Sequence, residues 1–328
     1  MTLSRRELLA TLALLAVTFA AHFVVSEYTV RILNLALIAG IAVLGLNFAF
    51  GWAGLITLAQ AAFVGFGAYG TALLTTRLGV DPWSASAIAV VGTALVAIVI
   101  GFPMLRLSGH YLALATLGLN VSFGIVTSNW VELTGGTNGI ASVPSYRLPW
   151  LTIDRADTFF PLAWTVLLLL TLAAYRIRSS SFGRAMIALR DDEIATRMSG
   201  VSAVGMKMTA FVIGAVYAAV AGVLFAHHSN FISPGDFDYI HSIFYLSMLI
   251  VGGEGSVLGA ILGAILVTFL PEWLRPLGDA YLSVFGVLVL LVLIFLPKGL
   301  TSLLPLLAPH RPRSDRESAL GTAVRDRA

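Results

Sequence analysis

The sequence predicts an all-α protein, a polytopic transmembrane bundle of about ten helices (8–10) with both termini in the cytoplasm. Of its 328 residues, 58% are hydrophobic and only 11% are charged, and the mean hydropathy is +0.91. One soluble core of this size cannot bury so much apolar surface. Apolar runs of about 17 to 22 residues recur, each near the length that crosses ~30 Å of hydrocarbon as a helix. The runs lack the alternating polarity of barrel strands, which favours helices.

Ten spans are expected in chain order. They cover residues 8–25, 31–50, 55–76, 85–104, 110–130, 159–176, 208–227, 240–252, 256–271 and 280–297. Two are weak, because 55–76 carries Gln60 among many glycines and 240–252 is short enough to belong to a re-entrant pair. The first span follows Arg5 and Arg6 and has the look of a signal peptide. No small-x-small cleavage site follows it before Ser26, which favours an uncleaved span.

The distribution of basic residues sets the expected orientation. An even number of spans puts both termini on one side, and Lys and Arg concentrate in cytoplasmic loops. With the termini inside, fifteen basic residues are cytoplasmic and five are outside. The five are Arg31, Arg77, Arg147, Arg155 and Arg275. This excess supports cytoplasmic termini over the inverse arrangement.

A charged island of about twenty residues, 181–200, separates two apolar runs and has a helix-forming composition. The wider segment from Arg176 to Lys207 holds six basic and three acidic residues. A membrane protein that concentrates its charge in one internal loop presents that loop to the aqueous phase. The island therefore predicts a docking helix for a soluble partner that supplies energy. The charges expected to face that partner are Arg190, Asp191, Asp192, Glu193 and Arg197.

Three polar side chains lie deep within predicted spans, and polar groups at membrane depth usually face a cavity or another helix. Gln60 is the strongly polar residue of the glycine-rich segment 51–70, while Thr116 and Asn120 belong to the fifth span. All three are candidates for lining a substrate path. The other interpretation is helix packing, which is favoured for the glycines and is equally good for Gln60.

The segment 134–140, Thr-Gly-Gly-Thr-Asn-Gly-Ile, is rich in turn residues and lies on the predicted outer face. Gly135, Gly136, Gly139 and Asn138 all favour turns with φ > 0. The segment is either an ordinary loop or a gate or docking surface that must adopt one tight conformation. The sequence does not decide between the two.

Several motifs are missing, and their absence narrows the function. The chain has no phosphate-binding Gly-x4-Gly-Lys-Ser/Thr loop, no cysteine and no His-Glu-x-x-His pattern, so neither catalysis nor a bound metal or cofactor is expected. The neighbouring His227 and His228 point apart on a helix. No span carries the paired carboxylates of a proton-coupled secondary transporter. The net charge of +3 comes from loops and tail and does not indicate nucleic-acid binding.

Six ordered blocks of sequence resemble the permease subunits of branched-chain amino acid ABC importers, over roughly residues 30 to 302. The blocks are Gly51-Trp-Ala-Gly-Leu with Phe66-Gly-Ala-Tyr69, Leu105-Arg-Leu-Ser-Gly-His-Tyr111, Thr134-Gly-Gly-Thr-Asn-Gly139, Ser181-Phe-Gly-Arg184 with Arg190-Asp-Asp-Glu-Ile-Ala195, Leu249-Ile-Val-Gly-Gly-Glu-Gly-Ser256, and Phe295-Leu-Pro-Lys-Gly-Leu300. The length and the fourth block favour the M-type permease over its H-type partner.

The resemblance implies a set of partners: a second, homologous permease, two cytoplasmic ATPases that bind ATP and magnesium, and an extracytoplasmic substrate-binding protein. It also implies a bacterial inner-membrane location in contact with lipid. Within the docking island it points to a coupling helix, onto which Ala195 and Gly200 fit. Ile194 and Thr196 depart from the usual Glu-Ala-Ala, so the individual contact residues are less well defined by the family.

The expected function is ATP-driven import of branched-chain or related amino acids by alternating access. The alternatives are a related ABC importer for urea or short amides, and a secondary transporter. A scaffold without transport would leave Gln60 and Asn120 unexplained. The chain is expected to divide into an N-terminal segment with the first helix (1–30), a permease domain (31–302) and a basic, disordered cytoplasmic tail (303–328).

Overall fold

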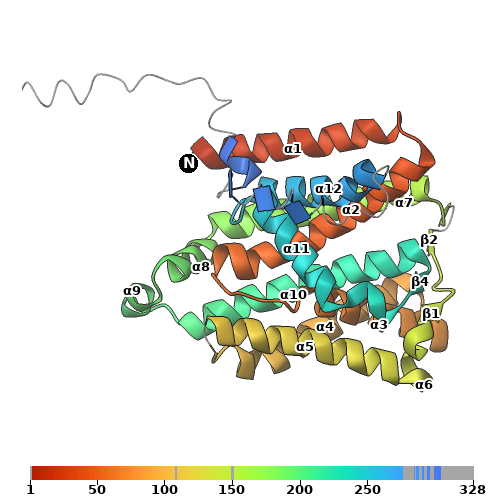
Figure 1. Cartoon of the computed structure of the whole chain (residues 1–328), viewed down its shortest axis with the longest axis horizontal. Coiled ribbons are helices and arrows are strands. Elements are labelled where there is room, and N and C mark those ends of the chain that lie inside the picture. The colour runs from red at the N-terminus through yellow and green to blue at the C-terminus, as the bar shows by residue number, and fades with distance from the viewer. Residues whose placement is uncertain are drawn as a thin grey trace, which may run out of the picture.

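The computed structural model describes residues 2–107, 109–148 and 151–275, together with 284, 286–287, 290–291, 294–295 and 299–303. This part of the chain is mainly helical, and its helices pack into one bundle (Figure 1). The helices are α1 (Thr2–His22), α2 (Glu27–Leu46), the π-helix η1 (Asn47–Trp52), α3 (Gln60–Arg77), α4 (Pro82–Met104), α5 (His110–Asn129), α6 (Val131–Thr134), the 3₁₀ turn η2 (Gly136–Asn138), α7 (Ala156–Ser179), α8 (Ser181–Asp191), α9 (Glu193–Met198), α10 (Ala203–Ser229), η3 (Pro234–Phe237), α11 (Tyr239–Gly252), α12 (Val257–Leu274) and η5 (Leu300–Leu303).

Six helices among the described residues are long and apolar enough to cross a membrane. They are Glu27–Trp52, Pro82–Met104, His110–Asn129, Ala156–Ser179, Ala203–Ser229 and Val257–Leu274, and each overlaps one predicted span. The predicted span 8–25 overlaps α1, which ends at His22 and is not among the six. The predicted span 240–252 corresponds to α11, an apolar helix of 14 residues. The tenth predicted span, 280–297, and the tail beyond residue 303 lie outside the described residues, apart from isolated positions in the span.

Local sequence signals fix where several helices begin. The side chains of Ser26, Asp81, Ser202 and Ser256 each accept a hydrogen bond from a backbone N–H in the first turn of α2, α4, α10 and α12, respectively. Such caps satisfy donors that a helix start leaves free. In α4 the cap is followed by Pro82, whose fixed φ suits the first helical position.

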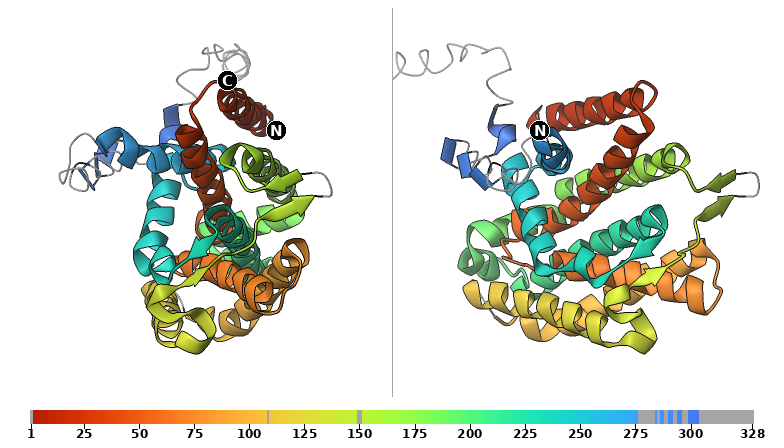
Figure 2. Two further views of the ribbon diagram at one scale, coloured as in Figure 1. Left: turned by 90° about the vertical axis from the view of Figure 1, so that its right-hand side faces the viewer. Right: turned by 45° about the vertical axis from the view of Figure 1, so that its right-hand side comes forward.

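The two ends of the bundle differ (Figure 1). At the α8–α9 end lie these two helices and the turn between α11 and α12. At the strand end lie two short antiparallel pairs, in which β1 (Ile140–Ala141) pairs with β4 (Phe231–Ile232) and β2 (Tyr146–Leu148) pairs with β3 (Leu151–Ile153). The β2–β3 hairpin projects from this end (Figure 2). The β1–β4 pair joins segments that are about ninety residues apart in the chain.

The core is built around α2. Within α2 and η1, 89% of the most apolar stretch is buried, against 28% in α4 and in α5, whose exposed faces carry Val99 and Leu114. The close approach of neighbouring helices depends on glycine, which has no side chain. A Cβ on Gly222 of α10 would lie 1.9 Å from the Val64 carbonyl oxygen of α3. Likewise, a Cβ on Gly263 would lie 1.9 Å from the Met248 carbonyl oxygen. These glycines therefore make internal helix contacts.

Candidate functional site

A buried break in the helical backbone precedes α3. The expected span 55–76 becomes regular helix only at Gln60, because residues 54–59 form no regular secondary structure. Leu55, Thr57 and Ala59 are nevertheless buried. The break follows directly on η1, and π-helical turns often occur at functional sites. Non-helical backbone at membrane depth needs hydrogen-bond partners from the surrounding protein.

Side chains of α5 and α11 supply those partners. The Thr116 hydroxyl accepts a hydrogen bond from the Leu58 N–H at 3.0 Å, and the Asn120 amide donates to the Leu58 carbonyl at 3.1 Å. The Asn120 amide also lies 2.7 Å from the Ser242 hydroxyl, which accepts from the Ala61 N–H at 2.9 Å. The structure therefore brings two of the three expected path residues, Thr116 and Asn120, to one buried cluster.

The position of Asn120 gives the depth of this cluster. Asn120 is near the middle of α5, about 15 Å from His110 at 1.5 Å rise per residue. α3 consequently starts well inside the bundle. Asn120 is fully buried, and its Oδ1 atom has no hydrogen-bond partner in the described structure.

Gln60, the third expected path residue, lies beside the cluster but bonds elsewhere. Its side-chain amide donates to the Ala42 carbonyl of α2 at 2.6 Å, and the residue is buried. This is the contact expected of a residue that joins two helices. Whether Gln60 also lines a path stays a prediction.

The charged island 181–200 forms two helices, α8 and α9, in place of the single docking helix expected there. α8 ends at Asp191, and Asp192 adopts an extended conformation (φ −155°, ψ 108°). The Asp192 carboxylate accepts hydrogen bonds from the Ile194 and Ala195 N–H groups at 2.8 and 3.0 Å. Asp192 therefore caps α9, because its short side chain satisfies donors at a helix start.

Most charges of the island bond within this chain. Glu193 accepts from Lys207 at 2.7 Å and from Arg197 at 2.5 Å. The hydrogen bond from Lys207 is the main cause of a lowered pKa of the Glu193 carboxyl. Arg190 turns toward the bundle and donates to the Gly51 carbonyl of η1 at 2.5 Å. Asp191 is the more exposed partner of its 3.8 Å pair with Arg190.

The exposed surface of α9 carries apolar as well as charged side chains. Ile194 is 72% exposed and Met198, one turn later, is 85% exposed. Ala195 is exposed between them, and Gly200 follows with φ +81°, in the left-handed region that glycine favours. The charge pattern of the island did not indicate this apolar pair. Its i, i+4 spacing was the available signal.

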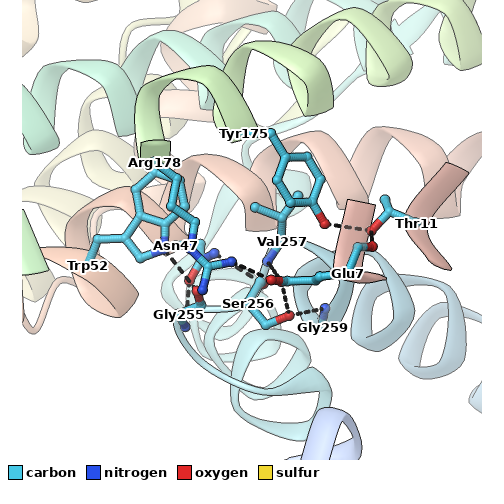
Figure 3. Close-up of polar contacts among 10 residues, drawn as sticks. All are labelled: Glu7, Thr11, Asn47, Trp52, Tyr175, Arg178, Gly255, Ser256, Val257 and Gly259. Carbon is cyan, nitrogen blue, oxygen red and sulfur yellow. Dashed lines mark hydrogen bonds and ion pairs between the residues drawn. The ribbon is translucent and has the colours of Figure 1, made fainter. Parts of the chain in front are cut away.

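The turn between α11 and α12, residues 253–256, is a junction that no sequence motif indicated (Figure 3). Asn47 of η1 accepts from the Gly255 N–H at 2.9 Å and donates to the Ser256 carbonyl at 3.2 Å. The Trp52 indole donates to the Gly255 carbonyl at 3.0 Å. Arg190 lies 4.0 Å from Glu254 and so connects α8 to both η1 and this turn.

Glu7 of α1 contacts the same turn from the other side (Figure 3). Its carboxylate accepts from Arg178 at 2.6 Å, from the Ser256 hydroxyl at 2.7 Å and from the Val257 N–H at 3.1 Å. The Glu7 side chain is only 16% exposed. A carboxylate at the start of α12 is favoured by the helix dipole. The contact attaches α1 to α7 and α12.

A cavity of about 190 Å³ lies between the buried break before α3 and the α8–α9 segment. It is bounded by residues 53–56 at the beginning of the break, the start of α5 and the α8–α9 segment. Arg190, Glu193 and Lys207 supply its charged lining. A displacement of α8–α9 would therefore change the space beside the break.

The expected positive φ values occur at the three glycines of segment 134–140 and not at Asn138, while its place on the outer face and its role as a gate or docking surface stay predictions. Gly135, Gly136 and Gly139 have φ values of 78°, 63° and 71°, and a Cβ on Gly135 would lie 2.1 Å from the Gly139 carbonyl oxygen. Asn138 instead lies in η2, without a positive φ, because the glycines on either side make the turns. The segment folds against β4 at the strand end.

No group of three or more potential metal ligands occurs among the described residues. His227 is occupied by the Thr71 hydroxyl at 2.9 Å and the Pro144 carbonyl at 2.6 Å. Its ring therefore joins α3 to the strand end.

Comparison with known proteins decides the family. Residues 28–297 match the model of the branched-chain amino acid transport system / permease component family. The chain belongs to this family. The high-affinity branched-chain amino acid permease LivM of Escherichia coli K12 is 38% identical, covering 93% of this chain and 76% of LivM. The corresponding LivH of Salmonella typhimurium is 27% identical, covering 78% of this chain and 89% of LivH.

The predicted resemblance to the M-type permease is thereby confirmed. The autoinducer 2 import permease LsrC of Yersinia enterocolitica is a more distant relative, 31% identical over 53% of this chain and 51% of LsrC. No solved structure matches the chain. Family membership and the six apolar helices identify a multi-pass inner-membrane permease of an ABC importer. Its homologues are transport subunits and not enzymes in themselves.

Proposed function

We propose that this chain is the M-type permease of an importer that carries branched-chain amino acids across the inner membrane by ATP-driven alternating access. The named substrates of LivM and LivH support the substrate class. A second permease of the LivH type completes the path. Two ATPases bind ATP and magnesium, and an extracytoplasmic binding protein delivers the substrate. The permease domain is 31–302.

One observation carries the coupling step. α9 presents Ile194 and Met198 to the exterior, while Arg190, one turn before α9, is bonded to Gly51 beside the buried break. An apolar pair on a charged surface is the composition of a protein contact. ATPase docking on α9 would move α8, and through Arg190 it would move η1 and the residues beside Gln60, Thr116 and Asn120. The path runs past this break.

The docking step is tested with the double variant Ile194→Asp, Met198→Asp in the complete importer. We expect stimulation of ATP hydrolysis by the loaded binding protein to fall by about tenfold or more, since buried apolar contacts dominate such interfaces. The matched control, Ile194→Val with Met198→Leu, keeps the surface apolar and should keep the stimulation. Unchanged stimulation in the Asp variant, with the complex intact, would contradict docking on α9.

Reversal of Asp192 and Glu193 to Lys is a less specific test. It should abolish coupling and leave membrane insertion intact, but Asp192 caps α9 and Glu193 binds Lys207. Loss of coupling in that variant reports the fold of α9 together with docking.

In the proposed orientation, with both termini inside, the α8–α9 end lies in the cytoplasm. The described chain has no cysteine, so single cysteines report accessibility cleanly. A cysteine at Ser179 should resist an impermeant thiol reagent in intact cells, and one at Ser233, near the strand end, should react. Labelling of Ser179→Cys from outside would overturn the orientation.

Substrate and path need separate measurements. If the reconstituted importer takes up urea or short amides and does not take up leucine, the chain belongs to the related urea or amide importers and the proposed substrate is wrong. For the path, uptake per folded complex is compared between wild type and Gln60→Leu. A wild-type rate in that variant would remove Gln60 from the path and leave it as a helix contact to α2.

A further inference from the structure

A second cavity, of about 460 Å³, opens at the strand end, away from the break and from α8–α9. It lies between the first turns of α2, the residues that lead into α7, and the last turn of α10. Its charged lining consists of Glu27, Arg31, Asp154 and Arg155, and its other polar lining residues are Tyr28, His227, His228, Ser229 and Asn230. A cavity of this size suits a small molecule.

The four charged residues of this cavity are exposed to solvent and do not pair with one another. Among the described residues, none of Glu27, Arg31, Asp154 and Arg155 has an ion-pair partner within the 4.0 Å limit. Glu27 and Arg31 are four residues apart on α2, with the acid first, which is the favourable arrangement for a helical ion pair. Two opposite charges that line one space without meeting leave room for a group between them.

The neighbouring polar groups that are already bonded define the walls. His227 bonds to the Pro144 carbonyl at 2.6 Å, and the Asn230 amide donates to the Val143 carbonyl at 2.8 Å. Both carbonyls belong to the segment between β1 and β2. Tyr28 donates to Glu272 and accepts from Arg275 at 3.1 Å, so it forms a fixed rim. The His228 ring packs on Phe159 with centroids 4.6 Å apart, yet its Nε2 atom is buried without a partner.

We propose that this cavity binds a zwitterionic small molecule, an amino acid. The Arg31 and Arg155 guanidinium groups match its carboxylate, since arginine binds carboxylates through paired N–H donors. Glu27 and Asp154 match its ammonium group, and Phe159 and Ile153 supply apolar wall for its side chain. This inference rests on the proposed function for its ligand class and adds a binding step on this chain.

A phosphatidylethanolamine headgroup has the same pair of charges, so the experiment separates the two sources. Radiolabelled leucine binding is measured on the purified complex of both permeases in phosphatidylcholine nanodiscs, without ATPase or binding protein. Two analogues compete: 2-hydroxy-4-methylpentanoate, which lacks the ammonium group, and 3-methylbutylamine, which lacks the carboxylate. A parallel set of nanodiscs contains phosphatidylethanolamine.

We expect leucine to bind and each analogue to compete about tenfold or more weakly, since each loses one charged contact. The variants Arg31→Gln with Arg155→Gln, and Glu27→Gln with Asp154→Asn, should each weaken leucine binding by about tenfold or more. Arg77→Gln and Asp157→Asn alter exposed charges near the same end that do not line the cavity, and should bind leucine normally. Thermal unfolding of each variant confirms that it is folded.

Three outcomes would overturn the proposal: no leucine binding, binding that the cavity variants do not change, or competition by either analogue at the strength of leucine. Retention of phosphatidylethanolamine that depends on Arg31 and Arg155, without leucine binding, would also overturn it and assign the cavity to lipid. Because the assay contains no ATPase, these results are independent of the transport function, which uptake by the complete importer tests separately.

Discussion

Two interruptions of helix in this permease are stabilised in opposite ways. The break before α3 is buried, and its backbone is bonded by Thr116, Asn120 and Ser242 from helices far away in sequence. The break between α8 and α9 is at the surface, and Asp192 bonds the next turn of its own chain. Burial therefore determines which groups bond to the backbone N–H and C=O groups at a helix break. Where water is absent, side chains of other helices must form these hydrogen bonds.

The largest expected effect concerns the buried break. Asn120→Leu would leave the Leu58 carbonyl without its 3.1 Å donor in the core. An unsatisfied buried group costs about 1–3 kcal/mol, so we expect a clear fall in the thermal unfolding temperature of the purified complex.

The control for that variant is Asn129→Leu, at the exposed end of the same helix, which removes a bond to the Ile125 carbonyl. Exposed substitutions usually change stability by about 0.5 kcal/mol or less. Equal unfolding temperatures for the two variants would show that the break does not depend on Asn120, and the contrast between buried and surface breaks would fail.

A smaller and more local effect is expected at the surface break. Asp192→Ala removes the cap of α9, worth about 1 kcal/mol, so the amides of Ile194 and Ala195 should exchange hydrogen faster. The global unfolding temperature should hardly move, because α9 contacts little of the core. Asp191→Ala, which removes only a long and exposed ion pair, should leave the exchange unchanged. Global destabilisation by Asp192→Ala would instead place this break within the folding core.

The smallest effect is a dependence on pH at the same place. The bond from Lys207 lowers the pKa of Glu193 in the folded state. A lowered carboxyl pKa contributes stability that is present above the unfolded value, about 4.3, and is lost as pH falls through the folded value. Exchange of the α9 amides should therefore accelerate in acid below about pH 4. Glu193→Gln should show fast exchange already at neutral pH and no such acid step. An identical acid step in both proteins would contradict the role of this carboxylate.

The sequence by itself determined the membrane class, six of the spans and the family, because hydropathy and short ordered blocks are properties of consecutive residues. It also contained the local signals that start helices, such as Ser26 and Asp81. It placed Thr116 and Asn120 among the deep polar residues. The same local reasoning failed at Asp192, whose capping role was overlooked in favour of its charge.

Only the tertiary structure decided what those residues contact. Asn47 and Trp52 hold a turn about two hundred residues away, and Glu7 reaches the same turn from α1. Nothing in the local sequence marks such partners, since a buried hydrogen bond depends on which helices become neighbours. Nor could sequence reveal that the acids and arginines at the strand end share one cavity and remain unpaired. Periodicity specifies which residues face inward, whereas packing specifies which of them meet.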